Sequence, residues 1–259
     1  SKAVKNNKIM MHIVAGYPSL TESEKVALLM CKCGVDFLEI QIPFSDPVAD
    51  GPTIMAANQK ALENGVKVDD CFRLMENLYK KTNGILASPK FLFMTYFNLV
   101  HHYGVEKFCK KTAQVGCYGL IIPDVPIDEE KSEKYLLNCK KYGLKPIQII
   151  SPLTRTERLK KIAKAARGFV YCVSRYGTTG QSKKLNPKLK DYLKKIKKYI
   201  KLPLAVGFGI SNKAHVDAVW KEADIAVIGS KIINLIGSDK NYLLRVAKFL
   251  KQIKKRPVV

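Results

Sequence analysis

The chain contains 259 residues with 45 lysines and arginines against 22 aspartates and glutamates, so its formal net charge is +23. Hydrophobic residues make up 47% and charged residues 26%, which excludes a disordered or fibrous chain and allows a sizeable core. This length fits one large domain or two small ones, and no change of composition marks a linker. We therefore expect residues 1–259 to form a single domain.

Eight short apolar runs, rich in β-branched and aromatic residues, alternate with helical segments along the chain. We predict strands at Ile9–Ala15, Phe37–Ile42, Phe91–Tyr96, Gly119–Ile122, Pro146–Ile150, Phe169–Ser174, Pro203–Gly207 and Ile225–Gly229. The long gap between the second and third runs predicts an unusually long loop and one helix. Strands that are apolar throughout are typical of parallel sheets, which are covered on both faces.

The helices are predicted from apolar spacing and from their end signals. They lie at Lys25–Cys33, Asp128–Tyr142 and Thr154–Ala166, with amphipathic helices in Lys183–Lys201 and Lys248–Arg256. Thr21–Glu24 fits a capping box, and helix-ending glycines are expected at Gly34, Gly116 and Gly143. Eight strand–helix units in this length predict an α/β fold, a (β/α)8 or TIM barrel. The alternative, an open doubly wound sheet, is disfavoured because no G-x-G-x-x-G motif follows the first strand.

The basic excess is concentrated in the Lys-rich segments 183–201 and 248–256. No recognition motif or aromatic stacking platform accompanies these lysines, which favours solvated helix faces over a nucleic-acid surface. The seven cysteines include no CxxC pair and the four histidines are dispersed, so we expect free thiols and no metal site. The apolar run after the polar N-terminus is too short for a signal sequence or a membrane span. We therefore expect a cytoplasmic protein without membrane attachment.

The second predicted strand carries an acidic residue among apolar neighbours, with Phe37, Glu39 and Gln41 on one face. A carboxylate inside a barrel is costly unless it is paired or used, and burial fits it for proton transfer near neutral pH. The loop that follows holds Asp46 and Asp50 among three prolines and a glycine, so its backbone is constrained. We predict a functional cluster of these three carboxylates. The alternatives are a buried ion pair for Glu39 and ordinary turn roles for the two aspartates.

Glycines follow each of the last three predicted strands, at Gly177, Gly180, Gly207, Gly209 and Gly229, and Ser230 comes directly after the last of them. Barrel enzymes often bind phosphate here through backbone N–H groups and helix N-termini, which glycine allows to approach closely. These positions predict a phosphate site, although turn glycines with positive φ are the simpler alternative. Carboxylates and a phosphate site together indicate acid–base chemistry on a phosphorylated small molecule.

The segment from Leu38 to Ile54 resembles the signature of the tryptophan synthase alpha chain family. Further matching segments occur in the same order at Gly16–Pro18, Tyr96–Asn98, Pro123–Pro126, Tyr171–Gly180, Gly207–Ser211 and Gly229–Ser230. The resemblance therefore covers essentially the whole chain. It implies a lyase of tryptophan biosynthesis that cleaves indole-3-glycerol phosphate, by a retro-aldol step, into indole and glyceraldehyde 3-phosphate.

By motif position, the resemblance implies that Glu39 is the catalytic acid–base and that Asp50 binds the indole N–H. It implies substrate contacts for Tyr96, Tyr171 and Thr179. Thr179 would belong to a mobile loop after the sixth strand and would meet Asp50 when that loop closes. The phosphate would be held by Gly180, Gly209, Gly229 and Ser230.

The resemblance also implies an α2β2 heterotetramer with the tryptophan synthase beta chain. Pyridoxal phosphate would belong to that partner, and this chain would need no cofactor. The expected contacts with the beta chain are Asp46, Pro47, Asn98 and Asp124.

The sequence departs from the family pattern at Gln41, where glycine is usual, and at His12, where an apolar aromatic residue is common. The Gln41 side chain is expected to project toward the site and to crowd or re-tune it. The chain also begins later than the family pattern, which predicts that most of the helix before the first strand is absent. Two alternatives therefore stay open: a catalytically weakened barrel that activates the beta chain allosterically, and a stand-alone lyase that releases indole.

Overall fold

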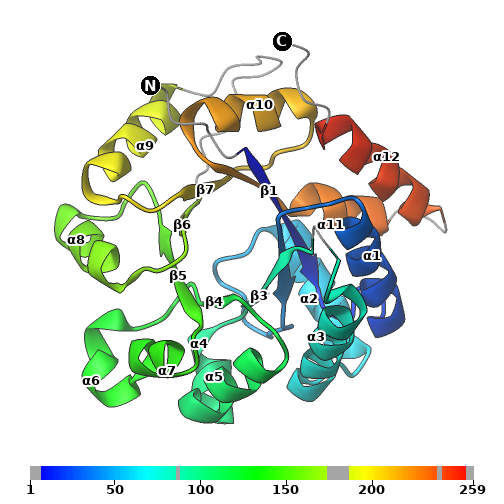
Figure 1. Cartoon of the computed structure of the whole chain (residues 1–259), viewed down its shortest axis with the longest axis horizontal. Helices are drawn as coiled ribbons and strands as arrows, with labels where there is room; N and C mark the ends of the chain where they lie inside the picture. Colours follow the sequence, from blue (N-terminus) through cyan, green and yellow to red (C-terminus); the bar gives the residue numbers. More distant parts are fainter. Residues whose placement is uncertain (1–6, 86–87, 174–186, 238–240, 255–259) are drawn as a thin grey trace.

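The computed structural model describes residues 7–85, 88–173, 187–237 and 241–254. Eight parallel strands form a closed barrel in sequence order, with β8 paired to β1 (Figure 1). They are β1 (Lys8–Val14), β2 (Phe37–Gln41), β3 (Lys90–Met94), β4 (Gly119–Ile121), β5 (Lys145–Ile150), β6 (Val170–Val173), β7 (Leu204–Gly207) and β8 (Ile225–Ile228). Every predicted strand is present, and the predicted (β/α)8 barrel is confirmed.

The two faces of each strand bury different parts of the core. The outer faces pack against the surrounding helices, which explains why the strands are apolar throughout. The inner faces fill the barrel, where the ring of Phe37 meets that of Phe169 edge-on at 5.2 Å. On β2 the alternation places Glu39 and Gln41 on the same face as Phe37, and all three are buried. The barrel interior therefore turns from apolar to polar toward the carboxyl end of β2.

Helices surround the barrel on its outside (Figure 1). They are α1 (Leu20–Lys32), α2 (Pro52–Glu63), α3 (Val68–Thr82), α4 (Phe97–Tyr103), α5 (Val105–Gln114), the 3-10 turn η1 (Ile127–Glu129), α6 (Glu130–Glu133), α7 (Tyr135–Lys141), α8 (Thr156–Ala165), α9 (Pro187–Tyr199), α10 (Lys213–Glu222), α11 (Ser230–Ile236) and α12 (Tyr242–Lys254). The gap between β2 and β3 holds two helices, so the prediction of one was wrong. Gly65, with φ 77°, turns the chain between them.

Helix α1 begins at Leu20, so the predicted start at Lys25 was wrong. The N-cap is Ser19, whose Oγ accepts a hydrogen bond from the Glu22 amide at 3.2 Å. Ser23, within the predicted capping box, instead accepts a hydrogen bond from the Gly16 amide at 2.9 Å and so fastens the β1–α1 turn. The predicted end is confirmed, because Gly34 follows the helix with φ 69°.

The single helix predicted over Asp128–Tyr142 is interrupted, so that prediction was wrong. Lys134 adopts a left-handed conformation with φ 55° and separates α6 from α7. The Glu130 carboxylate accepts hydrogen bonds from the amides of Leu136 and Leu137, both at 2.8 Å. A side chain from before the break therefore caps the helix that follows it.

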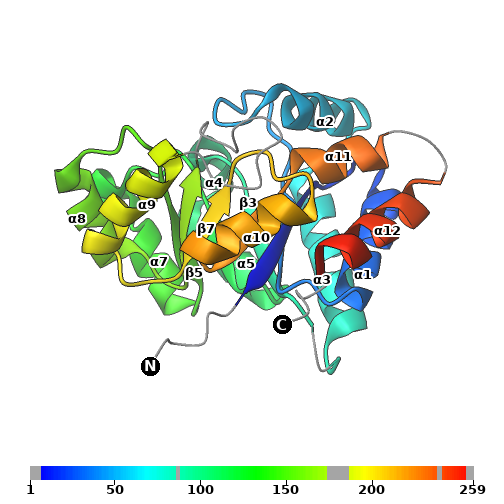
Figure 2. The same cartoon turned by 90° about the horizontal axis from the view of Figure 1, so that it is seen from above.

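The described parts of the two Lys-rich segments lie in α9 and α12, and their apolar positions face the core, as predicted. At the carboxyl ends of the strands, α2 and α11 lie close together (Figure 2), joined by an apolar cluster that includes Ala57, Ala61 and Ile233. The loop 42–51 leads from β2 into α2. The mobile loop predicted after β6 falls in 174–186, outside the described residues. Within the described ranges, every helix is too short or too polar to span a membrane.

Candidate active site

The carboxyl end of β2 brings two acidic side chains and one amide together. Glu39 and Gln41 are 2% and 0% exposed, so both side chains lie within the protein. Gln41 Nε2 donates a hydrogen bond to Asp50 Oδ2 at 2.6 Å. The Gln41 side chain thus projects toward the site, as expected, but its role there is to hold Asp50.

The loop 42–51 is fastened by side chains from two other elements. Tyr96, at the N-terminus of α4, accepts a hydrogen bond from the Ala49 amide at 3.1 Å. Its ring stacks on Phe44 with centroids 5.1 Å apart. Asn58 of α2 accepts a hydrogen bond from the Phe44 amide at 3.1 Å. These contacts fix the backbone on which Asp50 is carried.

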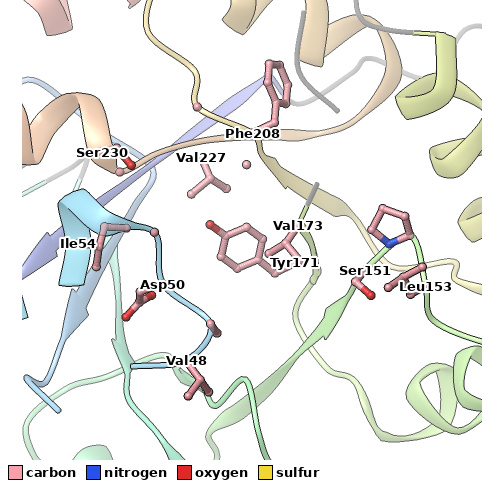
Figure 3. Close-up of a pocket in the computed structure, with 16 residues that line it drawn as sticks. Val48, Asp50, Ile54, Ser151, Leu153, Tyr171, Val173, Phe208, Val227 and Ser230 are labelled. Atoms are coloured by element: carbon pink, nitrogen blue, oxygen red, sulfur yellow. The ribbon is translucent and has the colours of Figure 1, made fainter. Parts of the chain in front are cut away.

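A cavity of about 780 Å³ opens at this end of the barrel, large enough for a small organic phosphate. In Figure 3 the side chains of Asp50, Tyr171 and Ser230 face this cavity from the β2 loop, from β6 and from the start of α11. Its lining is Val48, Ala49, Asp50, Gly51, Ile54, Ser151, Pro152, Leu153, Tyr171, Val173, Gly207, Phe208, Gly209, Val227, Gly229 and Ser230. Most of these residues follow or end a strand, where barrel enzymes carry their sites.

Gly207 and Gly209, at the end of β7 and in the loop after it, require glycine for different structural reasons. A Cβ at Gly207 would lie 2.9 Å from the Tyr171 hydroxyl, so glycine leaves room for that ring. Gly209 has φ 78°, a conformation that other residues rarely adopt. The alternative of a turn glycine with positive φ therefore holds for Gly209, which also lines the cavity.

Burial shifts the protonation of the groups in this site. Burial raises the pKa of Asp50, although the hydrogen bond from Gln41 opposes that shift. Burial also raises the pKa of the Tyr171 hydroxyl, and the nearby charges of Glu39 and Asp50 raise it further. Tyr171 is therefore a neutral hydrogen-bond donor at neutral pH.

The structure gathers some of the predicted site residues in the cavity and places others around it. Those lining the cavity are Asp50, Tyr171, Gly209, Gly229 and Ser230. Glu39 and Tyr96 are buried and outside this lining. Thr179 and Gly180 lie outside the described residues, as does Gly177.

Three of the four predicted partner contacts are exposed, and Pro47 is buried. Asp124 accepts a hydrogen bond from the Phe97 amide at 2.8 Å and so caps α4, next to exposed Asn98. Asp46 is exposed and accepts a hydrogen bond from Ser45 at 2.5 Å. Of the three carboxylates expected to cluster, Glu39 and Asp50 share the site, whereas Asp46 faces away into solvent.

Sequence reasoning missed several residues of the site. Ser151, Leu153 and Phe208 line the cavity directly after β5 and β7, and their position after a strand was the available signal. His12 Nδ1 lies 3.3 Å from Glu39 Oε2. This contact follows from the β1–β2 register, in which His12 is the partner of Glu39.

A closed parallel barrel with buried and half-buried carboxylates at its carboxyl end is the architecture of a (β/α)8-barrel enzyme that uses acid–base chemistry. The sequence pattern of the tryptophan synthase alpha chain family matches residues 1–256. The chain belongs to this family, whose members cleave indole-3-glycerol phosphate in tryptophan biosynthesis, and it is therefore a lyase of the alpha reaction.

Individual relatives agree with this assignment. A tryptophan synthase alpha chain from Syntrophotalea carbinolica is 41% identical over 252 residues, covering 97% of this chain and 96% of the relative. Another, from Methanocaldococcus jannaschii, is 44% identical over 224 residues, covering 86% and 77%. The crystal structure of a tryptophan synthase complex from Pyrococcus furiosus superposes with a TM-score of 0.85 at 28% identity, covering 96% and 98%.

Proposed function

We propose that Glu39 and Asp50 are the catalytic residues of the indole-3-glycerol phosphate cleavage. Glu39 in its acid form protonates the indole ring carbon that carries the glycerol chain, and its carboxylate accepts the proton of the neighbouring hydroxyl. The carbon–carbon bond then breaks, giving indole and the aldehyde. Asp50 accepts a hydrogen bond from the indole N–H and stabilises the positive charge that develops on the ring. The observation that carries this proposal is the pair of carboxylates at the β2 end of the barrel, with Glu39 buried on the strand and Asp50 lining the cavity.

The substrate phosphate is proposed to bind at Gly209, Gly229 and Ser230, with Gly180 as a further ligand. Ser230 begins α11 and Gly229 is its N-cap, so the N-terminal amides of that helix are close to the cavity. Tyr171 is proposed to pack beside the indole ring. Tyr96 is proposed to hold the loop 42–51, which carries Asp50. Thr179 stays a predicted lid residue that meets Asp50 when the loop after β6 closes.

The chain is proposed to assemble with the tryptophan synthase beta chain as an α2β2 heterotetramer. The proposed contact face includes Asp46, Asn98 and Asp124 at the mouth of the barrel, whereas the predicted contact Pro47 is buried. Val48 and Leu153 support it, because they expose 85% and 90% of their surface beside the cavity. Complexes called tryptophan synthase, such as that from Pyrococcus furiosus, also align with the chain.

We place the reaction in the cytoplasm and assign pyridoxal phosphate to the beta chain alone, so that this chain needs no cofactor. The seven cysteines, which all lie in the described part of the chain, are free thiols, as in proteins of a reducing compartment. The chemistry proposed for Glu39 and Asp50 is proton transfer and hydrogen bonding, which protein side chains supply by themselves.

The test is the rate of indole release from indole-3-glycerol phosphate, with and without a beta chain. We expect Glu39→Gln to lower this rate about 10²-fold or more, the usual scale of general acid–base catalysis. Glu63→Gln, which alters an exposed glutamate of α2, is the matched control and is expected to keep the parental rate. A wild-type rate equal to that of Glu39→Gln under both conditions would instead support the purely regulatory barrel.

A further inference from the structure

A histidine lies inside the barrel against the proposed catalytic glutamate. His12 is 5% exposed and Glu39 is 2% exposed, and 3.3 Å separates Nδ1 of the imidazole from Oε2 of the carboxylate. The β1–β2 register makes these two residues direct partners, so the contact is fixed by the sheet itself. A buried carboxylate is costly without a cation or donor, and His12 supplies one from the neighbouring strand.

The surroundings of His12 are polar on one side only. Glu39 and Gln41 of β2 both interact with the imidazole, and the charge of Asp50 acts on it as well. Tyr171 of β6 is close enough for its hydroxyl to be affected by both carboxylates. On the β8 side the neighbour is Gly229, where an added Cβ would lie 3.5 Å from the His12 Cβ. His12 Nε2 has no hydrogen-bond partner among the described residues, and Glu39 Oε2 contacts His12 Nδ1 as an ion pair. The imidazole therefore keeps one free polar atom beside this ion pair.

Charge favours the imidazolium form in this position. Burial alone would lower the pKa of His12, but the carboxylate of Glu39, and more weakly that of Asp50, raises it above the ordinary value of 6.5. The two carboxylates thus favour the imidazolium form of His12, and the imidazolium in turn opposes the rise in the pKa of Asp50.

We propose that His12 is a positioning residue for Glu39, holding its carboxyl group in place from the neighbouring strand β1. The proposal rests on the proposed function of Glu39 and adds a residue through which that function is tuned. His12 acts on the carboxylate and touches no reacting atom. A residue that merely fills the core would affect stability, whereas this one also sets the pH range of the reaction.

The first test measures the proton equilibrium of His12 and needs no activity. Its imidazole is titrated by nuclear magnetic resonance in the wild type and in Glu39→Gln, with the His12 signal assigned by its loss in His12→Gln. We expect a wild-type pKa above 6.5 that falls by about one unit or more in Glu39→Gln, as is usual when an opposite charge is removed. A His12 pKa that is the same in both proteins would overturn the proposal.

The second test is the pH dependence of kcat/KM for indole release. In His12→Gln the titrating imidazole beside Glu39 is lost, so we expect the pH profile of kcat/KM to change its position by about one unit or more. His102→Gln, an exposed histidine of α4, is the control and is expected to keep the parental profile. An unmoved profile in His12→Gln would contradict the proposed positioning role. Full activity in Glu39→Gln would refute the proposed function instead, and the titration would still decide whether His12 and Glu39 are coupled.

Discussion

Asp50 is a half-buried site residue whose charged form serves the proposed reaction but lowers the free energy of unfolding. Burial raises its pKa above the ordinary value of 3.8, whereas the unfolded chain keeps that ordinary value. Ionising Asp50 therefore costs folding free energy, and the cost is fully present at neutral pH and disappears as the pH falls through the folded-state pKa toward 3.8. The hydrogen bond from Gln41 reduces this cost without removing it.

We expect Asp50→Asn to lose lyase activity but to melt at a higher temperature than the wild type at pH 7. Each kcal/mol recovered raises Tm by about 2–4 °C in a domain of this size. The difference in Tm should shrink as the pH is lowered toward 4, where the wild-type carboxyl becomes protonated. Calorimetry between pH 4 and pH 7 checks this, with Asp46→Asn, an exposed acid of the same loop, as the control. An Asp50→Asn variant less stable than the wild type at pH 7 would show that this carboxylate is not strained by burial.

Individual side chains also show how far sequence alone predicts the site. Strand alternation was sufficient to place Glu39 and Gln41 on one face, because the period of two is a local property. The partners of those side chains were not predictable in the same way. His12 meets Glu39 through the register between two strands, and Gln41 meets Asp50 through the path of a loop. Neither register nor loop path is encoded in the spacing of apolar residues.

At the scale of elements, the loop 42–51 is positioned by contacts with its neighbours. The Tyr96 ring stacks on Phe44, and its hydroxyl accepts a hydrogen bond from the Ala49 amide and also interacts with the Asp50 carboxylate. We expect Tyr96→Phe to keep the ring contact and to remove the hydrogen bond, at a cost of about 1 kcal/mol. The Ala49 amide should then exchange its hydrogen faster, and kcat/KM should fall by about fivefold because Asp50 is held less firmly.

The matched control for this variant is Tyr103→Phe in the same helix. The Tyr103 hydroxyl donates to Asp69 on the protein surface, away from the β2 loop. Hydrogen exchange at Ala49 should therefore be unchanged in Tyr103→Phe. Equal exchange rates at Ala49 in Tyr96→Phe and the wild type would show that other contacts are sufficient to hold the loop.

The elements themselves differ in how well their sequence predicts them. All eight strands were predicted because buried parallel strands are continuous apolar runs between helices. Helix ends were predicted less well, since Ser19 and Ser23 are both acceptable caps and only tertiary contacts select between them. No glycine or proline stands at Lys134, so the sequence did not predict the break between α6 and α7. The Glu130 side chain stabilises this break. End signals are thus decisive only where no competing hydrogen bond exists.

At the scale of the whole molecule, the lysines and arginines of the described residues lie outside the cavity lining. The net charge is +23, yet none of the described residues that line the cavity is a lysine or arginine. A phosphate in this cavity would meet backbone amides and the Ser230 hydroxyl, with no basic side chain of that lining beside it. Because the described lining holds no basic side chain, we expect the field of the lysines elsewhere on the protein to help attract an anionic substrate, over a Debye length of about 10 Å at 0.1 M salt.

This distribution predicts that salt affects substrate capture more than the chemical step. Raising the ionic strength from 0.05 M to 0.5 M shortens the Debye length severalfold, so kcat/KM for indole-3-glycerol phosphate should fall severalfold while kcat stays nearly constant. The control is the same substrate without its phosphate, for which the salt dependence should vanish because it carries no net charge. Steady-state kinetics on both substrates across a sodium chloride series make the comparison. An equal salt dependence for the two would place the effect of salt on the protein itself, and would show that its positive field does not guide the phosphate.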